Sequence, residues 1–221
     1  MQSQLVDCNG DKRPDVAVSL TAGGVTNTET TLRYYLADSN GKIGMTESQE
    51  VNLSDSHCNL MVTDFNRDGL PEIVVPAVEM GAIAASKMFL LKKTDLHLLI
   101  YPIRNGLPIT EPAKRFEYEF RFDFENPNPT GEISINWAAD YNDNSLLDAV
   151  FSDGNGRLLF FWGNESDFLS RRPDLEITLD HPSAVYPIQL NSGSLSDLIV
   201  EHNLTGRFDR LTVLKNRNNK M

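Results

Sequence analysis

The chain has 221 residues and a formal net charge of −11 at pH 7, with 40% hydrophobic and 23% charged residues. These proportions are typical of a globular protein that buries a core in one or two domains. The acidic balance argues against a nucleic-acid backbone or an anionic membrane surface as partner, because both require a basic face. No apolar stretch is long enough to cross a bilayer, so we expect no membrane insertion in this segment.

The first residues lack the basic start and the apolar core of a signal peptide and run directly into a polar loop. We therefore expect the segment to be part of a longer chain whose natural start lies upstream. The two cysteines, Cys8 and Cys58, exclude a disulfide scaffold. A single bridge between them stays open as an alternative, and free thiols are favoured.

In chain order, the pattern predicts a single domain over residues 1–221 with four strand-rich repeats, at about residues 1–55, 56–128, 129–180 and 181–221. Short runs with apolar alternation, separated by glycine- and asparagine-rich turns, are typical of strands. The strands expected in the first repeat are Gln4–Val6, Asp15–Leu20, Thr31–Leu36 and Glu47–Leu53. This repeat is predicted to form one four-stranded antiparallel unit.

The second repeat is predicted to contain strands at residues 60–62, 73–75, 87–92 and 96–102, with residues 81–86 as a loop or a short helical turn. Aromatic and charged residues then alternate from Phe116 to Glu125, which predicts a strand with one buried aromatic face. A ligand-stacking surface is the less favoured interpretation of these aromatics. The repeat is long, so residues 103–128 are expected to hold an insertion or an extra strand.

The third repeat is predicted to place strands at residues 133–139, 149–152, 157–162 and 175–179, with a hairpin turn at residues 153–156. The fourth repeat starts near residue 184 and continues with strands at residues 198–201 and 211–214. We expect no room for a fourth strand after residue 216.

Four nine-residue loops share one register: Asp7–Asp15 (loop 1), Asp64–Glu72 (loop 2), Asp140–Asp148 (loop 3) and Gln189–Asp197 (loop 4). The first three carry side-chain oxygens at positions 1, 3, 5 and 9, and an apolar run follows each loop at once. Alternating oxygens on a tight loop suit Ca²⁺, which takes six to eight oxygen ligands. An EF-hand is excluded because its twelfth position is a glutamate on a helix, whereas Val75 stands there in loop 2. Repetition in one register indicates a repeat architecture.

The candidate calcium ligands are the side chains at positions 1, 3, 5 and 9 and the backbone carbonyl at position 7. They are Asp7, Asn9, Asp11, Arg13 and Asp15 in loop 1, Asp64, Asn66, Asp68, Leu70 and Glu72 in loop 2, and Asp140, Asn142, Asn144, Leu146 and Asp148 in loop 3. Loops 1 and 2 each offer three carboxylates and loop 3 offers two, while loop 4 keeps only Asp197 and is expected to be empty. Metal-free Asx-turns are the alternative.

Position 6 supplies a second criterion for ranking the loops. If this position requires a positive φ, glycine is favoured there and any other residue is strained by roughly 1 kcal/mol. Only loop 2 has a glycine at position 6, Gly69, whereas loop 1 has Lys12 and loop 3 has Ser145. The sequence therefore predicts that loop 2 binds calcium best.

These loops resemble the FG-GAP/VCBS repeats of integrin-α-type β-propellers, in which an Asp-x-(Asp/Asn)-x-(Asp/Asn)-Gly-x-x-Asp loop links the first two strands of a blade. The resemblance implies an all-β fold, a partial β-propeller of about four blades of four-stranded antiparallel sheet, with structural Ca²⁺ bound in loops between the first two strands of blades. It also implies an extracytoplasmic setting (secreted, periplasmic or cell surface) and a protein or glycan partner in adhesion.

The chain shows no recognisable catalytic motif, so we predict that it is not an enzyme. No zinc-type histidine pair, nucleophile elbow, P-loop or dinucleotide fingerprint follows a strand. Asp153 and Asp180 are a conceivable acid pair, but surface turns explain them better. Two alternatives to a binding module stay open: the propeller portion of a secreted carbohydrate-active enzyme (a polysaccharide lyase or hydrolase), and a structural shell subunit of a secreted toxin-like assembly.

Overall fold

The computed structural model describes residues 2–24, 26–54, 56–58, 60–104, 107–121, 139–152, 156–180, 182–190, 195–203 and 208–216. The chain divides into two compact units, Met1–Asp64 with Asp68–Glu119 (unit 1) and Phe65–Arg67 with Phe120–Met221 (unit 2). The described strands form several antiparallel sheets, and no closed propeller ring is found among them. No helix of the described residues is long and apolar enough to cross a membrane.

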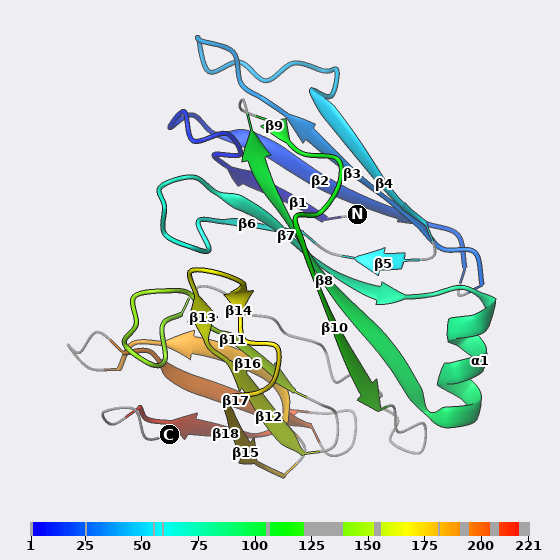
Figure 1. The fold of residues 1–221 in the computed structure, drawn as a ribbon, viewed down its shortest axis with the longest axis vertical. Helices are drawn as coiled ribbons and strands as arrows, with labels where there is room; N and C mark the ends of the chain where they lie inside the picture. Colours follow the sequence, from blue (N-terminus) through cyan, green and yellow to red (C-terminus); the bar gives the residue numbers. More distant parts are fainter. Residues whose placement is uncertain are drawn as a thin grey trace. The chain divides into compact units, whose positions relative to one another are not determined.

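The first sheet of unit 1 confirms the predicted four-stranded repeat. Its strands are β1 (Gln2–Val6), β2 (Asp15–Ala22), β3 (Glu29–Tyr35) and β4 (Gln49–Ser54). They pair antiparallel in chain order (Figure 1). In β2, Ala17 and Ser19 are buried while Val16 and Val18 are only half-buried, so alternate residues point to the core.

The second sheet of unit 1 is built around the two long strands β7 (Glu72–Glu79) and β8 (Lys93–Arg104). The order is β10 (Lys114–Arg121), β8, β7, β5 (Ser56–Cys58), and β6 (Met61–Thr63) also pairs with β7, while β9 (Leu107–Pro108) pairs with β8. The predicted strands at residues 60–62, 73–75 and 96–102 are confirmed in position, although β7 and β8 are both longer than predicted. Strands β9 and β10 occupy the range in which an insertion or an extra strand was expected.

Strand β10 bears out the predicted alternation as far as the structure describes it. Phe116 is buried, whereas Arg115 and Glu117 on either side of it are exposed. This favours core packing over ligand stacking for Phe116. Tyr118 is half-buried, and the other aromatic side chains of the predicted strand, Phe120, Phe122 and Phe124, lie outside the described part.

The prediction of a strand at residues 87–92 is wrong, because this stretch belongs to the helix α1 (Ala82–Leu91). Alanine, leucine, methionine and lysine, the residues that fill it, favour helix, and Ile83 is its sole β-branched residue. The left-handed conformation of Lys92, with φ 55°, ends the helix. The expected loop or short turn at residues 81–86 is thus the first half of a helix of 10 residues.

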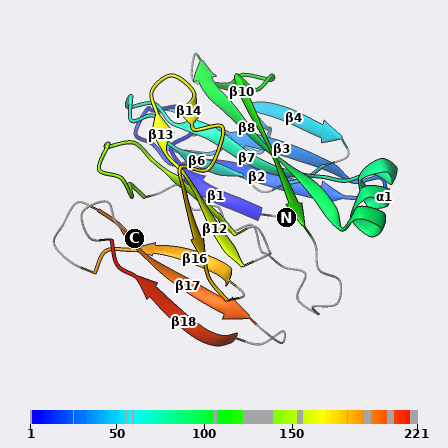
Figure 2. The ribbon, with the colours of Figure 1, turned by 60° about the horizontal axis from the view of Figure 1, so that its bottom comes forward.

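The described residues of unit 2 form two three-stranded sheets and a small ribbon (Figures 1 and 2). One sheet has the order β11 (Ala149–Ser152), β12 (Arg157–Phe161), β15 (Leu175–Thr178), and the other has β16 (Pro182–Ile188), β17 (Asp197–Asn203), β18 (Phe208–Leu214). The ribbon pairs β13 (Gly163–Asn164) with β14 (Phe168–Leu169). The predicted strands at residues 149–152, 157–162, 175–179, 198–201 and 211–214 are confirmed in position. Residues 133–138, 153–155 and 217–221 lie outside the described part.

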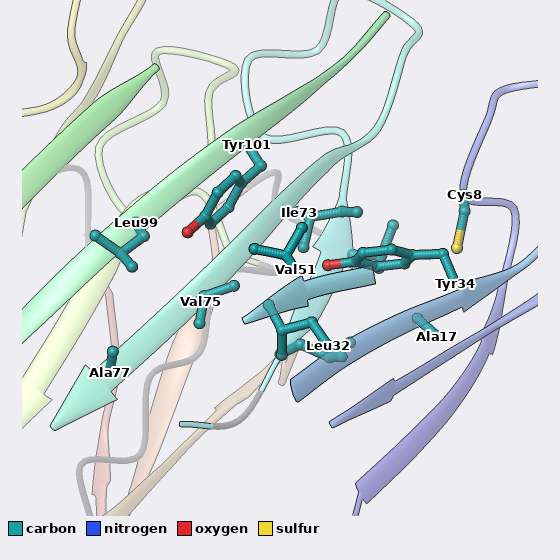
Figure 3. Close-up of a cluster of buried hydrophobic side chains, with 12 residues drawn as sticks. Cys8, Ala17, Leu32, Tyr34, Val51, Ile73, Val75, Ala77, Leu99 and Tyr101 are labelled. Atoms are coloured by element: carbon teal, nitrogen blue, oxygen red, sulfur yellow. The ribbon is translucent and has the colours of Figure 1, made fainter. Parts of the chain in front are cut away.

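Each unit buries a core between its two sheets. In unit 1, Leu32 and Tyr34 of the first sheet pack with Ile73, Val75 and Tyr101 of the second (Figure 3). In unit 2 the cluster joins both three-stranded sheets: Ala139, Tyr141, Val150, Leu158, Phe160, Val185, Leu198 and Val200. Apolar faces packed in this way are the main source of stability of such small sheets. The same cores hold the second residue of loops 1 and 3.

Candidate metal-binding loops

Loops 1, 2 and 3 adopt the same unusual backbone conformation. The residue at position 6 has a positive φ in each loop: 66° at Lys12, 90° at Gly69 and 66° at Ser145. This confirms the prediction that position 6 favours glycine, and it strains the two loops that lack one. Position 4 is also left-handed in each loop, at Gly10, Arg67 and Asp143. Sequence reasoning missed position 4, because only loop 1 has a glycine there.

The aspartate at position 1 is held inside the loop by backbone amides. Its Oδ2 atom accepts the N–H of position 6 in every loop: Lys12 to Asp7 at 2.7 Å, Gly69 to Asp64 at 3.0 Å and Ser145 to Asp140 at 2.7 Å. The Oδ1 atom at position 5 accepts the N–H of position 7: Arg13 to Asp11 at 2.9 Å, Leu70 to Asp68 at 2.8 Å and Leu146 to Asn144 at 2.9 Å. These Asx-type turns fix the side-chain oxygens of positions 1 and 5 in one orientation.

Position 3 completes the set of oxygens in loops 1 and 3. The Oδ1 atom of Asn9 accepts the N–H of Asp11 at 3.0 Å, and Asn142 accepts the N–H of Asn144 at 3.0 Å. In loop 1 the side-chain amide of Asn9 also donates to Asp11 Oδ2 at 3.0 Å. In loops 1 and 3 the side chain of position 3 therefore lies against the backbone of position 5.

The acid at position 9 has a second role that the sequence did not reveal. In loop 1 the carboxylate of Asp15 is fully buried, and its Oδ2 accepts the N–H of Cys8 at 2.9 Å. Its Oδ1 accepts the N–H of Ala37 at 2.8 Å, just beyond the end of β3. The side chain thus ties the second residue of the loop to the end of a neighbouring strand. We call this carboxylate with its two amides the clasp.

The clasp recurs in unit 2, including the loop whose other ligands are lost. In loop 3, Asp148 accepts the N–H of Tyr141 at 2.6 Å and of Gly163 at 2.8 Å. In loop 4, Asp197 accepts the N–H of Leu190 at 3.1 Å and of Asn216 at 2.8 Å. Because the clasp persists in loop 4, the carboxylate has a structural reason to be there apart from any cation. Glu72, the acid at position 9 of loop 2, is also buried.

Charge is balanced differently from loop to loop. In loop 1, Arg13 forms an ion pair with Asp11. Although burial opposes it, the hydrogen bonds from Arg13 and Asn9 and the positive charge of Arg13 hold the pKa of Asp11 below its ordinary value. In loop 3, burial and the nearby charge of Asp140 raise the pKa of Asp148 to about 7, against the lowering effect of backbone hydrogen bonds from Gly163, Tyr141 and Asn142.

Loop 2 provides the test of whether a cation fits. The Oδ1 atom of Asp64 is buried, and the described residues offer it no hydrogen-bond donor. A buried carboxylate oxygen without a donor is costly unless a cation meets it. A clasp oxygen can also accept an amide and still coordinate a metal, because each carboxylate offers about four lone pairs. A hard cation such as Ca²⁺ would satisfy this oxygen, because it binds carboxylate, amide and backbone oxygens.

The described residues contain no cluster of three or more His, Cys, Asp or Glu side chains placed to hold a metal. The loops are consistent with this, because asparagine occupies position 3 in all three loops, and in loops 1 and 3 the position-9 acid turns toward its clasp amides. A site of this kind would depend on carbonyl and amide oxygens as much as on carboxylates, which is acceptable for Ca²⁺.

The remaining candidate residues are outside the proposed ligand set, although Cys8 occupies position 2 of loop 1. Cys8 is a free, buried thiol, and burial together with the charges of Asp15 and Asp7 raises its pKa to about 12. The side chain of Cys58, the other half of the bridge considered above, lies outside the described residues. His202 is buried and lies 2.8 Å from Thr212 Oγ1. Asp153, half of the conceivable acid pair, also lies outside the described part.

Comparison with known proteins identifies part of the chain. Residues 7–75 match the family described as FG-GAP-like repeat, and this stretch includes loop 1, loop 2 and the strands between them. No curated protein matches the chain. The matched region is the one in which the loop geometry repeats from the first sheet to the second.

Proposed function

We propose that this FG-GAP repeat protein is a non-catalytic β-propeller-type module that is stabilised by calcium and binds a protein or a glycan, at the cell surface or outside the cell. The observation that carries the calcium part is the buried Oδ1 atom of Asp64, which lacks a donor among the described residues. Loop 2 adds an unstrained glycine at position 6, with φ 90° at Gly69.

Each loop position would contribute to calcium binding in a different way. Positions 1, 3 and 5 present side-chain oxygens that the loop amides already orient, and position 7 adds its carbonyl. The position-9 acid is held at the mouth of the following strand, so a cation there would join the loop to the sheet. Calcium bound only by the folded loop stabilises the fold by mass action, by about 2.7 kcal/mol at a concentration 100 times the dissociation constant.

The binding role is supported by the repeat family and by the resemblance of the loops to integrin-α-type repeats. Fold analogy carries this inference, since a fold alone does not fix a function. The extracytoplasmic setting is supported in the same way, by the family to which the repeats are similar.

Thermal melts with Ca²⁺, with Mg²⁺ and with EGTA test the calcium part. Wild-type protein is compared with Asp64→Ala/Asp68→Ala and with the control Glu47→Ala/Glu111→Ala, which removes two exposed carboxylates outside the loops. We expect Ca²⁺ to raise the wild-type Tm by roughly 5–10 °C and Mg²⁺ to raise it much less. The loop 2 variant should lose most of this shift and the control should keep it. A wild-type Tm that does not change with Ca²⁺, or a Ca²⁺-dependent shift in Tm that persists in the loop 2 variant, would overturn the assignment of loop 2 as a calcium site.

A further inference from the structure

Helix α1 exposes four of its five large apolar side chains to solvent and buries only alanines. Ile83 is 87% exposed, Leu90 82%, Phe89 65% and Leu91 62%. The buried residues of the helix are Ala84 and Ala85. A helix that serves only to cover a sheet buries its large side chains and exposes polar ones. Ile83, Phe89, Leu90 and Leu91 are called the α1 patch below.

Ile83 and Leu90 are seven residues apart, so they lie on the same side of the helix. Phe89 and Leu91 flank Leu90 and widen the apolar surface around it. Contiguous exposed apolar surface of this kind is unusual on a soluble protein and marks interaction sites more often than chance. Single exposed residues elsewhere in unit 1, such as Met45, need no such explanation.

A polar cleft of about 460 Å³ adjoins this helix on the sheet of β7, β8 and β10. It is lined by Glu79, Asp95, His97, Arg115, Glu117, Tyr118 and Glu119. Lys87 links the helix to the cleft, because its Nζ atom lies 2.6 Å from Asp95 Oδ2 and 3.3 Å from Glu119 Oε2. The α1 patch and this acidic cleft are therefore neighbouring parts of one surface of unit 1.

The cleft carries more negative than positive charge. Lys87 and Lys93 pair with Asp95 and Glu119, and Arg115 pairs with Glu117 at 3.2 Å. Three cations thus face four carboxylates. The fourth carboxylate is that of Glu79, and no cation of the described residues lies within ion-pair distance of it.

His97, at the floor of the cleft, does not supply the missing positive charge. Burial and the adjacent guanidinium of Arg115 lower the pKa of His97, although Glu117, Glu79 and Asp95 act in the opposite direction. Arg115 Nη2 lies 2.9 Å from His97 Nδ1, a contact that suits a neutral ring accepting the hydrogen bond. The cleft is therefore complementary to one additional cation.

We propose that the α1 patch and the acidic cleft together dock a protein segment that carries large apolar side chains next to a lysine or arginine. The apolar side chains cover the patch, and the cation meets Glu79 beside His97. An anionic lipid surface fits less well, because the carboxylates of the cleft would repel it. This inference rests on the proposed binding role and specifies its partner, but it does not depend on calcium.

The test uses two acetylated and amidated tripeptides, leucine–lysine–leucine and leucine–glutamate–leucine, titrated into the ¹⁵N-labelled full chain and followed by NMR. We expect the lysine peptide to shift resonances of α1 and of the cleft strands β7, β8 and β10. The glutamate peptide should bind roughly fivefold more weakly, as should Glu79→Gln with the lysine peptide. Ile83→Ser/Leu90→Ser should lose most of the binding to both peptides.

Two matched variants serve as controls, Met45→Ser for an exposed apolar side chain and Glu47→Gln for an exposed carboxylate outside the cleft. Both should bind the lysine peptide as the wild type does. All the substituted residues in α1 are exposed, so the variants should melt at the wild-type temperature.

Three outcomes would overturn the proposal: no shifts at all, shifts that map away from α1 and the cleft, or equal binding of the two peptides. Flotation with vesicles of phosphatidylcholine and phosphatidylglycerol distinguishes the lipid alternative, since vesicle binding that requires Ile83 and Leu90 while the peptides fail would also overturn it. A retained calcium-dependent melt in that case would leave the proposed calcium-stabilised module intact and remove only the docking surface.

Discussion

Loop 1 and loop 2 have the same spacing and share two hydrogen bonds, from the N–H of position 6 to the side chain of position 1 and from the N–H of position 7 to the side chain of position 5. They differ at Oδ1 of position 1, which in loop 1 accepts the backbone amides of Asn9, Gly10 and Asp11. In loop 1 the carboxylate of Asp11 is paired with Arg13, and Lys12 occupies the left-handed position. In loop 2 the corresponding position is Gly69, and the buried Oδ1 atom of Asp64 has no donor among the described residues. The comparison teaches that the number of carboxylates alone does not rank the calcium affinity of such loops. A cationic side chain within the loop, such as Arg13, can neutralise a carboxylate that a bound metal would otherwise neutralise.

Removing a clasp carboxylate should have the largest effect on stability. It also separates the structural role of the position-9 acid from its proposed role as a calcium ligand. Asp15→Ala removes the acceptor of two buried amides, those of Cys8 and Ala37. We expect a loss of about 2–4 kcal/mol in the free energy of unfolding, measured by urea denaturation in EGTA. Asp197→Ala should cost a similar amount, although loop 4 has lost its other ligands.

Asp38→Ala is the matched control, because this exposed aspartate also accepts backbone amides, from Asn40 and Lys42, but in a surface turn. Its cost should stay well below that of Asp15→Ala, since water replaces the lost acceptor. If the cost of Asp15→Ala appeared only in the presence of Ca²⁺, Asp15 would be a ligand and the clasp would have no role of its own.

The next largest effect concerns position 5, where the two loops can be compared by one substitution. Asp68→Asn in loop 2 and Asp11→Asn in loop 1 each replace a carboxylate by an amide of the same shape. We expect Asp68→Asn to weaken calcium binding by about tenfold, measured by calorimetric titration, since it removes a full ligand charge. Asp11→Asn should weaken it less, because Arg13 already neutralises Asp11. Equal losses would show that the ion pair does not distinguish the loops.

Position 6 gives a smaller effect of opposite sign in the two loops. Gly69→Ala places a side chain at φ 90°, and a Cβ atom there would meet nothing within 4 Å, so the cost is one of backbone conformation alone. We expect Gly69→Ala to destabilise the protein by about 1 kcal/mol and Lys12→Gly to stabilise it by about 0.5–1 kcal/mol. Chemical denaturation in EGTA measures both. If Lys12→Gly instead destabilised the protein by the same amount as Gly69→Ala, the extra freedom of glycine in the unfolded chain would outweigh the relief of backbone strain at position 6.

The strand pattern and the register of the loops could be predicted from the sequence, because both are local signals. Alternation identifies β10, and the oxygen spacing identifies positions 1, 3 and 5. The helix α1 was missed because an apolar run such as Met88–Leu91 fits a buried strand as well as a helix, and only the alanines before it favour helix. The clasp was missed for a different reason. The amide of Ala37 lies 22 residues from Asp15, and only the pairing of β2 with β3 brings the two together.

The smallest effect is expected from Arg13→Gln. This variant tests most directly whether the Arg13–Asp11 ion pair causes the difference between loop 1 and loop 2. The substitution removes the guanidinium from Asp11 but keeps the backbone carbonyl at position 7, the proposed ligand. Stability in EGTA should change little, because the pair is only partly buried and solvent screens it. Calcium affinity of loop 1 should rise by roughly two- to fivefold, because the cation no longer competes with an internal charge. Arg67→Gln at position 4 of loop 2 removes the same charge from the molecule. An equal gain in the calcium affinity of loop 2 would mean that the overall charge of the protein, and not the Arg13–Asp11 pair, sets the difference in calcium affinity between the two loops.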